Sequence, residues 1–223
     1  MVTVNSISGE YIMKVLNLYA CLGGNRLKWT DCEVTAVELD PELARMYQER
    51  FPNDTVIVGD AVEYLLNNYW KFDLIWFSFP CPSHSRARFW SSKGNPEKVK
   101  PVLPDMTLYS LIIFLDNYFD GKWVGENVVP YYKPLIPGVK IGRHLFWSNF
   151  IIPNFKSKDA DIKEGNIKEW SEFHKVDISS YKGWQRKDKI LRNLVHYDTG
   201  LHIFNLAKGI HKSNNSNQTT LEL

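Results

Sequence analysis

The sequence predicts an α/β fold in which helices cover both faces of a mostly parallel sheet. Short apolar runs rich in β-branched residues alternate with helical segments of roughly 8–12 residues, a pattern typical of parallel strands joined by crossover helices. The length of 223 residues fits one domain with a small appendage. With 44% hydrophobic and 23% charged residues, the composition excludes a wholly disordered chain.

The first half of the chain supplies four predicted strands. The first strand ends in a turn that contains Gly23 and Gly24. Asp40 and Pro41 then begin a helix, because Asp is a favoured N-cap and Pro fits the first helical position. We expect strands over residues 15–19, 34–38, 55–58 and 72–77, a short helix over 26–31, and helices over 41–51 and 61–69.

The second half is expected to complete the sheet and add an annex. A helix is predicted over residues 105–118, strands over 123–124 and 142–152, and a helical pattern over 193–208. After Pro153 the apolar periodicity breaks into a polar, lysine-bearing stretch. The expected organisation is a core (1–152), a small annex (153–189), a segment that returns to the core (190–211) and a disordered tail (212–223).

Charge and composition narrow the class of protein. Residues 1–60 carry five Lys/Arg and nine Asp/Glu, whereas the remainder carries 22 and 16, which suits a small-molecule site followed by a surface for a polyanion. No run approaches the ~18–20 apolar residues of a membrane span, and the first dozen residues lack the features of a signal peptide. Met13 is an alternative start. Three cysteines without a CxxC spacing indicate neither a disulfide framework nor a metal site, so we expect a reducing, cytoplasmic compartment. We also expect a monomer that does not bind a membrane.

A ligand crevice is predicted where the first strands end. The glycine turn allows close approach of the backbone, and the carboxylates of Glu38 and Asp60 follow the next two strands. One carboxylate can accept hydrogen bonds from ribose hydroxyls and the other from an exocyclic amine, which favours a nucleoside-containing cofactor. Neither GxGxxG nor GxxxxGK[ST] is present, which disfavours a dinucleotide or a P-loop nucleotide. The alternative is that both carboxylates only cap the following helices.

Cys81 is the candidate nucleophile. It follows the fourth strand between Pro80 and Pro82, at the same edge of the sheet as the crevice, and basic residues come soon after it. Glu126 ends the next strand and is a candidate acid or hydrogen-bond anchor. The competing interpretation of an isolated cysteine is a small buried hydrophobe, which we assign to Cys21 and Cys32.

The order of these segments resembles the DNA cytosine-5 methyltransferases. The segments are residues 18–24 (LYACLGG), Phe79-Pro80-Cys81, Glu126-Asn127-Val128, Arg143 before 145–147, and Arg192-Asn193-Leu194-Val195. The resemblance covers about residues 14–152 and 186–208. It implies the Rossmann-like sheet of S-adenosylmethionine-dependent methyltransferases, with 153–189 as a reduced target-recognition annex. Cys21, Pro82 and Arg192 depart from the family pattern of Gly, Gln and Gly.

The resemblance also implies roles for individual residues. The catalytic set is Cys81, which adds to C6 of cytosine, Glu126, which binds the N3/N4 edge, and Arg143, which holds O2. S-adenosylmethionine would be bound by Tyr19, Ala20, Cys21, Gly23, Gly24, Glu38, Leu39, Asp60, Ala61, Pro80 and Asn193.

The expected partner is double-stranded DNA, from which the target base must be flipped out. Residues 86–100, with five basic residues and one acid, are expected to form a mobile loop on the phosphate backbone, with Phe89 or Trp90 available to fill or stack. The residues expected to contact DNA are Ser85, Arg86, Arg88 and Lys93. The competing interpretation of this stretch is an exposed loop whose two aromatics are tucked into the core.

Alternative functions stay open at this point. One is a transfer-RNA methyltransferase with the same catalytic apparatus, and another is a degenerate module that binds S-adenosylmethionine or DNA without turnover. An amino-directed DNA methyltransferase ranks low, because Ser78-Phe79-Pro80-Cys81 lacks that class's motif. The annex is small, so we expect a short target of about two to four base pairs or relaxed specificity. Such an enzyme suits a solitary role in a bacterial or phage-infected cell.

Overall fold

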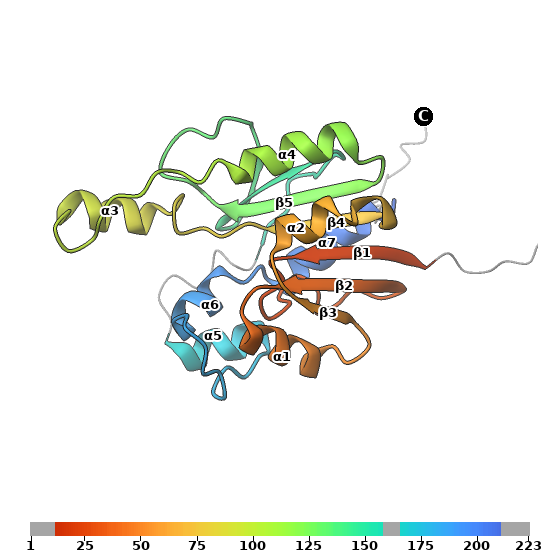
Figure 1. Cartoon of the computed structure of the whole chain (residues 1–223), viewed down its shortest axis with the longest axis horizontal. Helices are drawn as coiled ribbons and strands as arrows, with labels where there is room; N and C mark the ends of the chain where they lie inside the picture. Colours follow the sequence, from red (N-terminus) through yellow and green to blue (C-terminus); the bar gives the residue numbers. More distant parts are fainter. Residues whose placement is uncertain (1–11, 158–165, 211–223) are drawn as a thin grey trace, which may run out of the picture.

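The structure, a computed structural model, describes residues 12–157 and 166–210. A seven-stranded sheet has the order β3-β2-β1-β4-β5-β7-β6, with β7 antiparallel to both of its neighbours (Figure 1). The strands are β1 (Met13–Leu18), β2 (Cys32–Glu38), β3 (Thr55–Val58), β4 (Leu74–Ser78), β5 (Lys122–Val128), β6 (Val139–Ile141) and β7 (His144–Ser148). The predicted class, a mostly parallel Rossmann-like sheet with helices on both faces, is confirmed.

Helices connect the strands and cover the sheet. They are α1 (Pro41–Arg50), α2 (Ala61–Leu66), the 3-10 helix η1 (Tyr69–Lys71), α3 (Arg86–Gly94), α4 (Thr107–Tyr118), α5 (Ile167–His174), α6 (Lys187–Asn193) and α7 (Tyr197–Ala207). Among the described residues, no helix is long and apolar enough to cross a membrane. Figure 1 shows α3 projecting from the body of the molecule.

The two faces of the sheet bury separate apolar clusters. On one face, Leu16 and Ile75 of the central strands pack with α4, whose Leu115 is fully buried. On the other face, Trp76 packs with Phe204 of α7. Central strands of a parallel sheet are buried on both faces, which explains why β1 and β4 are nearly continuous apolar runs. This arrangement fixes the carboxyl ends of β1, β2, β4 and β5 along one edge.

Four predicted elements differ in the structure. Residues 26–31 form turns, because Arg26 binds Asp54 and the Trp29 carbonyl and thereby fixes a segment too short to be a stable helix. The predicted strand over 142–152 is shorter in the structure: it is β7, which pairs with the preceding β6 through a turn at Gly142, where φ is 58°.

The other two differences concern helices. The expected loop over residues 86–100 contains α3, whose N-terminus is capped by the Ser85 hydroxyl, which accepts from the Arg88 N–H. The helical pattern predicted over 193–208 corresponds to α7, which begins only at Tyr197 because His196 leaves helical geometry and its Nδ1 caps the helix, whereas Asn193 ends α6. The apolar periodicity therefore continues across residues 193–208, whereas the helical backbone is interrupted at residues 194–196.

The segment after residue 165 packs against α1 and the glycine turn. An Asn166–Glu169 capping box begins α5, and Trp170 and Tyr181 pack with Leu43 of α1. Trp184, in contrast, is 68% exposed. The predicted disordered tail (212–223) and residues 1–11 lie outside the described part of the chain.

Candidate active site

The glycine turn after β1 is tightly wound. Tyr19, Cys21 and Gly23 have φ values of 55°, 48° and 64°, in the left-handed region that favours glycine. A Cβ on Gly24 would lie 2.6 Å from the carbonyl oxygen of Val195, so a side chain there would collide with backbone. The turn therefore packs closely on the segment that follows α6, and Cys21 adopts a conformation for which the family pattern has glycine.

Glu38 fixes this turn from the end of β2. Its Oε2 accepts a hydrogen bond from the Cys21 N–H at 2.8 Å, and its Oε1 accepts one from the Asp40 N–H at 2.9 Å. The carboxylate is 8% exposed, and its burial raises its pKa. Each oxygen keeps a second lone pair, so the carboxylate can still accept from a ligand hydroxyl.

Asp60 both caps a helix and lines the cavity at the strand ends. Its Oδ1 accepts hydrogen bonds from the Val62 and Glu63 N–H groups at 2.8 Å, so it is the N-cap of α2. The same residue lines the cavity at the strand ends. Its charge contributes, after burial, to a raised pKa of the Tyr19 phenol.

Cys81 and Glu126 come together because β4 and β5 are parallel neighbours. Ser78 pairs with Glu126 in the register, and the Phe79 N–H donates to the Glu126 carbonyl at 3.1 Å. The Asn127 side-chain amide donates to the Phe79 carbonyl at 3.2 Å, which ties the two loops again. Glu126 is 4% exposed. A thiol and a buried carboxylate thus lie at adjacent strand ends.

One cavity of about 470 Å³ joins the glycine turn to these two groups. Its lining includes ten of the eleven residues predicted to bind the cofactor: Tyr19, Ala20, Cys21, Gly24, Glu38, Leu39, Asp60, Ala61, Pro80 and Asn193. Cys81 and Glu126 line it as well. Gly23 does not line it, since a Cβ there would point at the rings of Tyr47 and Phe51.

The electrostatics of the cavity hold Cys81 as a thiol in the free protein. Burial, followed by the charge of Glu126, raises the pKa of Cys81 to about 11. A hydrogen bond with the Asn193 side chain and the charge of Lys189 act in the opposite direction. Because the thiolate is the nucleophile, a ligand that neutralises Glu126 or adds positive charge would activate Cys81.

Arg143 is not brought to this cavity. It occupies the turn between β6 and β7, and its guanidinium carbon lies 5.1 Å from the ring centroid of Trp170 in α5. The residues predicted to contact DNA lie on the other side of Cys81. Ser85, Arg88 and Lys93 line a second cavity, and the Arg86 Nε donates to the Pro130 carbonyl.

Sequence reasoning missed two groups that face the site. His144 is 2% exposed, and its Nε2 lies 3.7 Å from Glu126 Oε1. Among the described residues that line the larger cavity, Lys189 is the one cation, one helical turn before Asn193 on α6. The four-residue spacing from Lys189 to Asn193 was a readable signal, because i and i+4 share a helix face. His144 gave no signal before the hairpin register was known.

Comparison with known proteins gives one family match. The model of the C-5 cytosine-specific DNA methylase family matches residues 13–99. This stretch contains the glycine turn, Glu38, Asp60 and Cys81, and it ends before Glu126. No curated protein matches the chain.

Solved structures resemble the fold at low identity. A DNMT2 mutant from Spodoptera frugiperda is 19% identical with a TM-score of 0.42, over 66% of this chain and 53% of that one. TrmN from Thermus thermophilus is 14% identical with a TM-score of 0.33, over 52% of this chain and 33% of that one. An RNA methyltransferase from Salinibacter ruber, in complex with S-adenosyl-L-homocysteine, is 12% identical with a TM-score of 0.37, over 66% of this chain and 87% of that one. The chain thus spans about half the length of the first structure.

Three observations are consistent with the same class of protein: the strand order, the residues that line the cavity, and the family match. The match supports the C-5 cytosine DNA methylase family and indicates an S-adenosylmethionine-dependent methyltransferase. The ligand crevice lies at the carboxyl ends of parallel strands, where open α/β sheets bind ligands.

Proposed function

We propose that this protein is a DNA cytosine-5 methyltransferase that methylates C5 of cytosine through a covalent adduct with Cys81. The observation that carries the proposal is the single cavity shared by Cys81, Glu126 and the glycine turn. A nucleophile and a carboxylate facing one ligand site are the groups that covalent activation of a pyrimidine requires. The family match over residues 13–99 supports the same chemistry.

The glycine-turn end of the cavity fits S-adenosylmethionine. Tyr19 supplies an aromatic face for adenine, Glu38 accepts from the ribose hydroxyls, and Asp60 accepts from the adenine amine. The cavity of about 470 Å³ lies in the range of small-molecule sites. When bound, this cofactor supplies the methyl group that C5 receives.

Cys81 and Glu126 activate the base. Cytosine C5 is a weak nucleophile, so the Cys81 thiolate adds to C6 and the C5–C6 π electrons move toward the N3 side of the ring. Glu126 in its protonated form donates to N3 and accepts from the N4 amine, which stabilises the negative charge that develops on N3. Once C5 carries the methyl group, a base removes the C5 proton, the C5–C6 double bond re-forms and the thiolate leaves.

The buried histidine beside Glu126 takes the role of a positioning group. His144 Nε2 lies 3.7 Å from the carboxylate, on the strand that pairs with β5. Arg143, which the family pattern assigns to the base, is held over Trp170 instead. Lys189 is the cation that faces the reacting base from α6.

A duplex substrate requires the target base to leave the stack, because C6 is shielded inside the helix. The projecting helix α3 and the lysines after it supply positive charge for the phosphate backbone, through Arg86, Lys93, Lys98 and Lys100. Phe89 stacks on Tyr131 at 4.5 Å, whereas Trp90 is 62% exposed, so Trp90 is the aromatic available to fill the vacated space.

The annex presents a small surface, so we propose a short target sequence. Bidentate base contacts supply about 1–3 kcal/mol of discrimination each, and a few such contacts read about two to four base pairs. A monomeric enzyme with this specificity suits solitary modification of bacterial or phage DNA better than partnership with a long-site nuclease.

Transfer of labelled methyl groups tests the proposal. Tritiated S-adenosylmethionine is incubated with unmethylated plasmid DNA and, separately, with unmodified transfer RNA, using wild-type protein and Cys81→Ala. We expect label in DNA with the wild type alone. Label only in transfer RNA moves the activity to RNA. No label in either, with cofactor binding retained in calorimetry, identifies a binding module and contradicts the proposal.

A further inference from the structure

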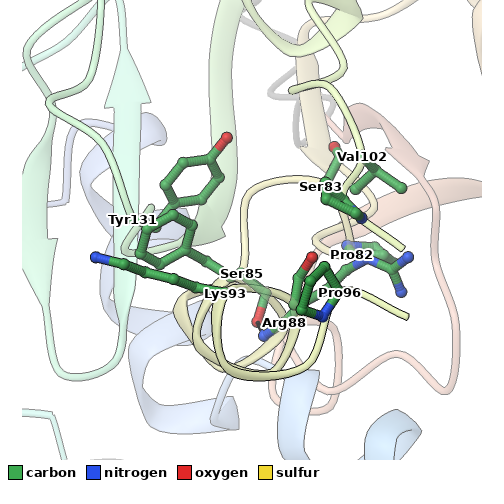
Figure 2. Close-up of a pocket in the computed structure, with 11 residues that line it drawn as sticks. Pro82, Ser83, Ser85, Arg88, Lys93, Pro96, Val102 and Tyr131 are labelled. Atoms are coloured by element: carbon green, nitrogen blue, oxygen red, sulfur yellow. Dashed lines mark hydrogen bonds between the residues drawn. The ribbon is translucent and has the colours of Figure 1, made fainter. Parts of the chain in front are cut away.

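A second cavity lies directly beside the active site. It has a volume of about 290 Å³, is open to solvent on one side, and is lined by the loop after Cys81, helix α3, the segment before α4 and Tyr131 (Figure 2). Its lining residues are Pro82, Ser83, Ser85, Arg88, Phe89, Ser92, Lys93, Pro96, Pro101, Val102 and Tyr131. Pro82 belongs to both cavities, so one residue separates them. A polymer whose reacting unit occupies the first cavity has its neighbouring unit close to the second.

The walls of the second cavity suit a flat ring. Phe89 and Tyr131 stack with their centroids 4.5 Å apart and their planes 4° from parallel, and Figure 2 shows Tyr131 with the side chains of Pro82, Pro96 and Val102 around the same space. Aromatic and proline faces contact nucleobases well, and such stacking is typical of nucleic-acid sites. A phosphate, in contrast, would lose hydration against these apolar walls.

Two residues that line this cavity carry buried polar groups that have no hydrogen-bond partner among the described residues. The Arg88 Nη2 donates to the Lys100 carbonyl at 3.1 Å, which holds the guanidinium in place, whereas the buried Arg88 Nε has no partner among the described residues. The Ser92 hydroxyl, on a residue 6% exposed, likewise has none within the described chain.

The two other serines of this cavity already accept hydrogen bonds from backbone N–H groups. Ser83 accepts from the Asp105 N–H, and Ser85 accepts from the Arg88 N–H. Buried donors without acceptors cost free energy, which a ligand with matching acceptors would recover. Arg88 Nε and the Ser92 hydroxyl are therefore the buried polar groups of this cavity without a partner among the described residues, whereas the hydroxyls of Ser83, Ser85 and Tyr131 and the exposed Lys93 ammonium are further donors along its lining.

The donor pattern selects among the bases. Guanine presents two adjacent acceptors, O6 and N7, which match the fork of an arginine. Adenine and cytosine place an amino donor at the corresponding edge, and thymine offers one acceptor beside a methyl group. An arginine in an apolar slot therefore favours guanine over the other three bases.

We propose that this second cavity binds the guanine next to the target cytosine in DNA, with Arg88 reading O6 and N7 and Ser92 adding a further contact. The inference rests on the proposed function, because the neighbouring cavity must hold the cytosine. It assigns Arg88 to base reading, whereas the other basic residues of α3 contact phosphates. The expected specificity is a dinucleotide preference, with guanine on one side of the cytosine.

Modified bases test the proposal without changing the protein. Duplexes carry one cytosine with guanine 5′ or 3′ of it, and this guanine is replaced by 7-deazaguanine or by hypoxanthine. Hypoxanthine keeps O6 and N7, so kcat/KM should be unchanged. 7-Deazaguanine lacks the N7 acceptor, so kcat/KM on the side that is read should fall roughly 5- to 150-fold. Equal rates for all three bases on both sides overturn the proposal.

Two variants separate base reading from charge. Arg88→Lys keeps the positive charge but not the fork, so the preference for guanine over adenine should disappear. Lys98→Met removes a charge from the same segment outside the cavity, so it should weaken all contexts alike and keep the preference. If Arg88→Lys instead lowers kcat/KM by the same factor in every sequence context and keeps the preference for guanine, Arg88 contacts phosphate and the proposal is wrong.

The failure of the proposed function has a different signature. In that case no cytosine is methylated in any context, including with wild-type protein. Binding of the same duplexes, followed by fluorescence anisotropy, still reports on the cavity: an affinity that does not distinguish guanine from 7-deazaguanine overturns the guanine site itself.

Discussion

Replacing Glu126 with glutamine should make Cys81 more reactive while it abolishes methyl transfer. The pKa of Cys81 is raised from 9.0 to about 11 by burial and, second, by the charge of Glu126. At a pH below both values the thiolate fraction changes tenfold for each unit of pKa, so a return to 9.0 would raise it about a hundredfold. Burial is the larger cause and remains in the variant. We therefore expect a rise of roughly three- to tenfold in thiolate at pH 8.

Alkylation measures this effect directly. The rate of iodoacetamide addition to the Cys81 peptide is followed by mass spectrometry at pH 7–9 in the free protein. Glu63→Gln, an exposed change on α2, is the matched control and should leave the rate unaltered. Methyl transfer should be lost in Glu126→Gln alone. Alkylation that is unchanged or slower in Glu126→Gln would refute the reasoning about this pair.

The remaining predictions concern three other residues. Lys189→Met should raise the pKa of Cys81 and slow its alkylation at pH 8, and Lys189→Arg should restore it; a pH profile identical to wild type would exclude Lys189 from this role. Cys21→Val should lower the unfolding free energy by about 1–3 kcal/mol, because a β-branched residue is strained at positive φ, whereas Cys21→Gly should stay near wild type in urea melts. Glu38→Ala should weaken S-adenosylmethionine binding in calorimetry and also lower stability by about 1–3 kcal/mol for each backbone N–H left without an acceptor; unchanged affinity would remove Glu38 from the cofactor site.

The core of the fold was predictable because its signals are local. The apolar runs of β1, β3 and β4 and the Asp40–Pro41 start of α1 are each readable within one segment. The short helix over 26–31 was wrong because a distant partner, Asp54, decides the backbone there. No local pattern carries that information.

The residues of the site likewise divide into those that a local pattern identifies and those that only distant contacts position. Cys81, Glu38 and Asp60 could be placed because parallel strands bring their carboxyl ends to one edge. Arg143 and His144 could not, since the hairpin turn at Gly142 decides which of them faces Glu126. The Arg143 guanidinium lies over the ring of Trp170, a residue far along the chain, so no local pattern encodes this contact.

The covalent step through Cys81 is the central claim, and a mechanism-based substrate tests it most directly. A duplex with 5-fluorocytosine at the target blocks release, because fluorine at C5 cannot leave as a proton does. Wild-type protein with S-adenosylmethionine should form an adduct that survives denaturing electrophoresis, attached at the Cys81 peptide, and Cys81→Ser should form none. An adduct that persists in Cys81→Ser would contradict the account, as would methylation of cytosine by wild-type protein with no trapped species.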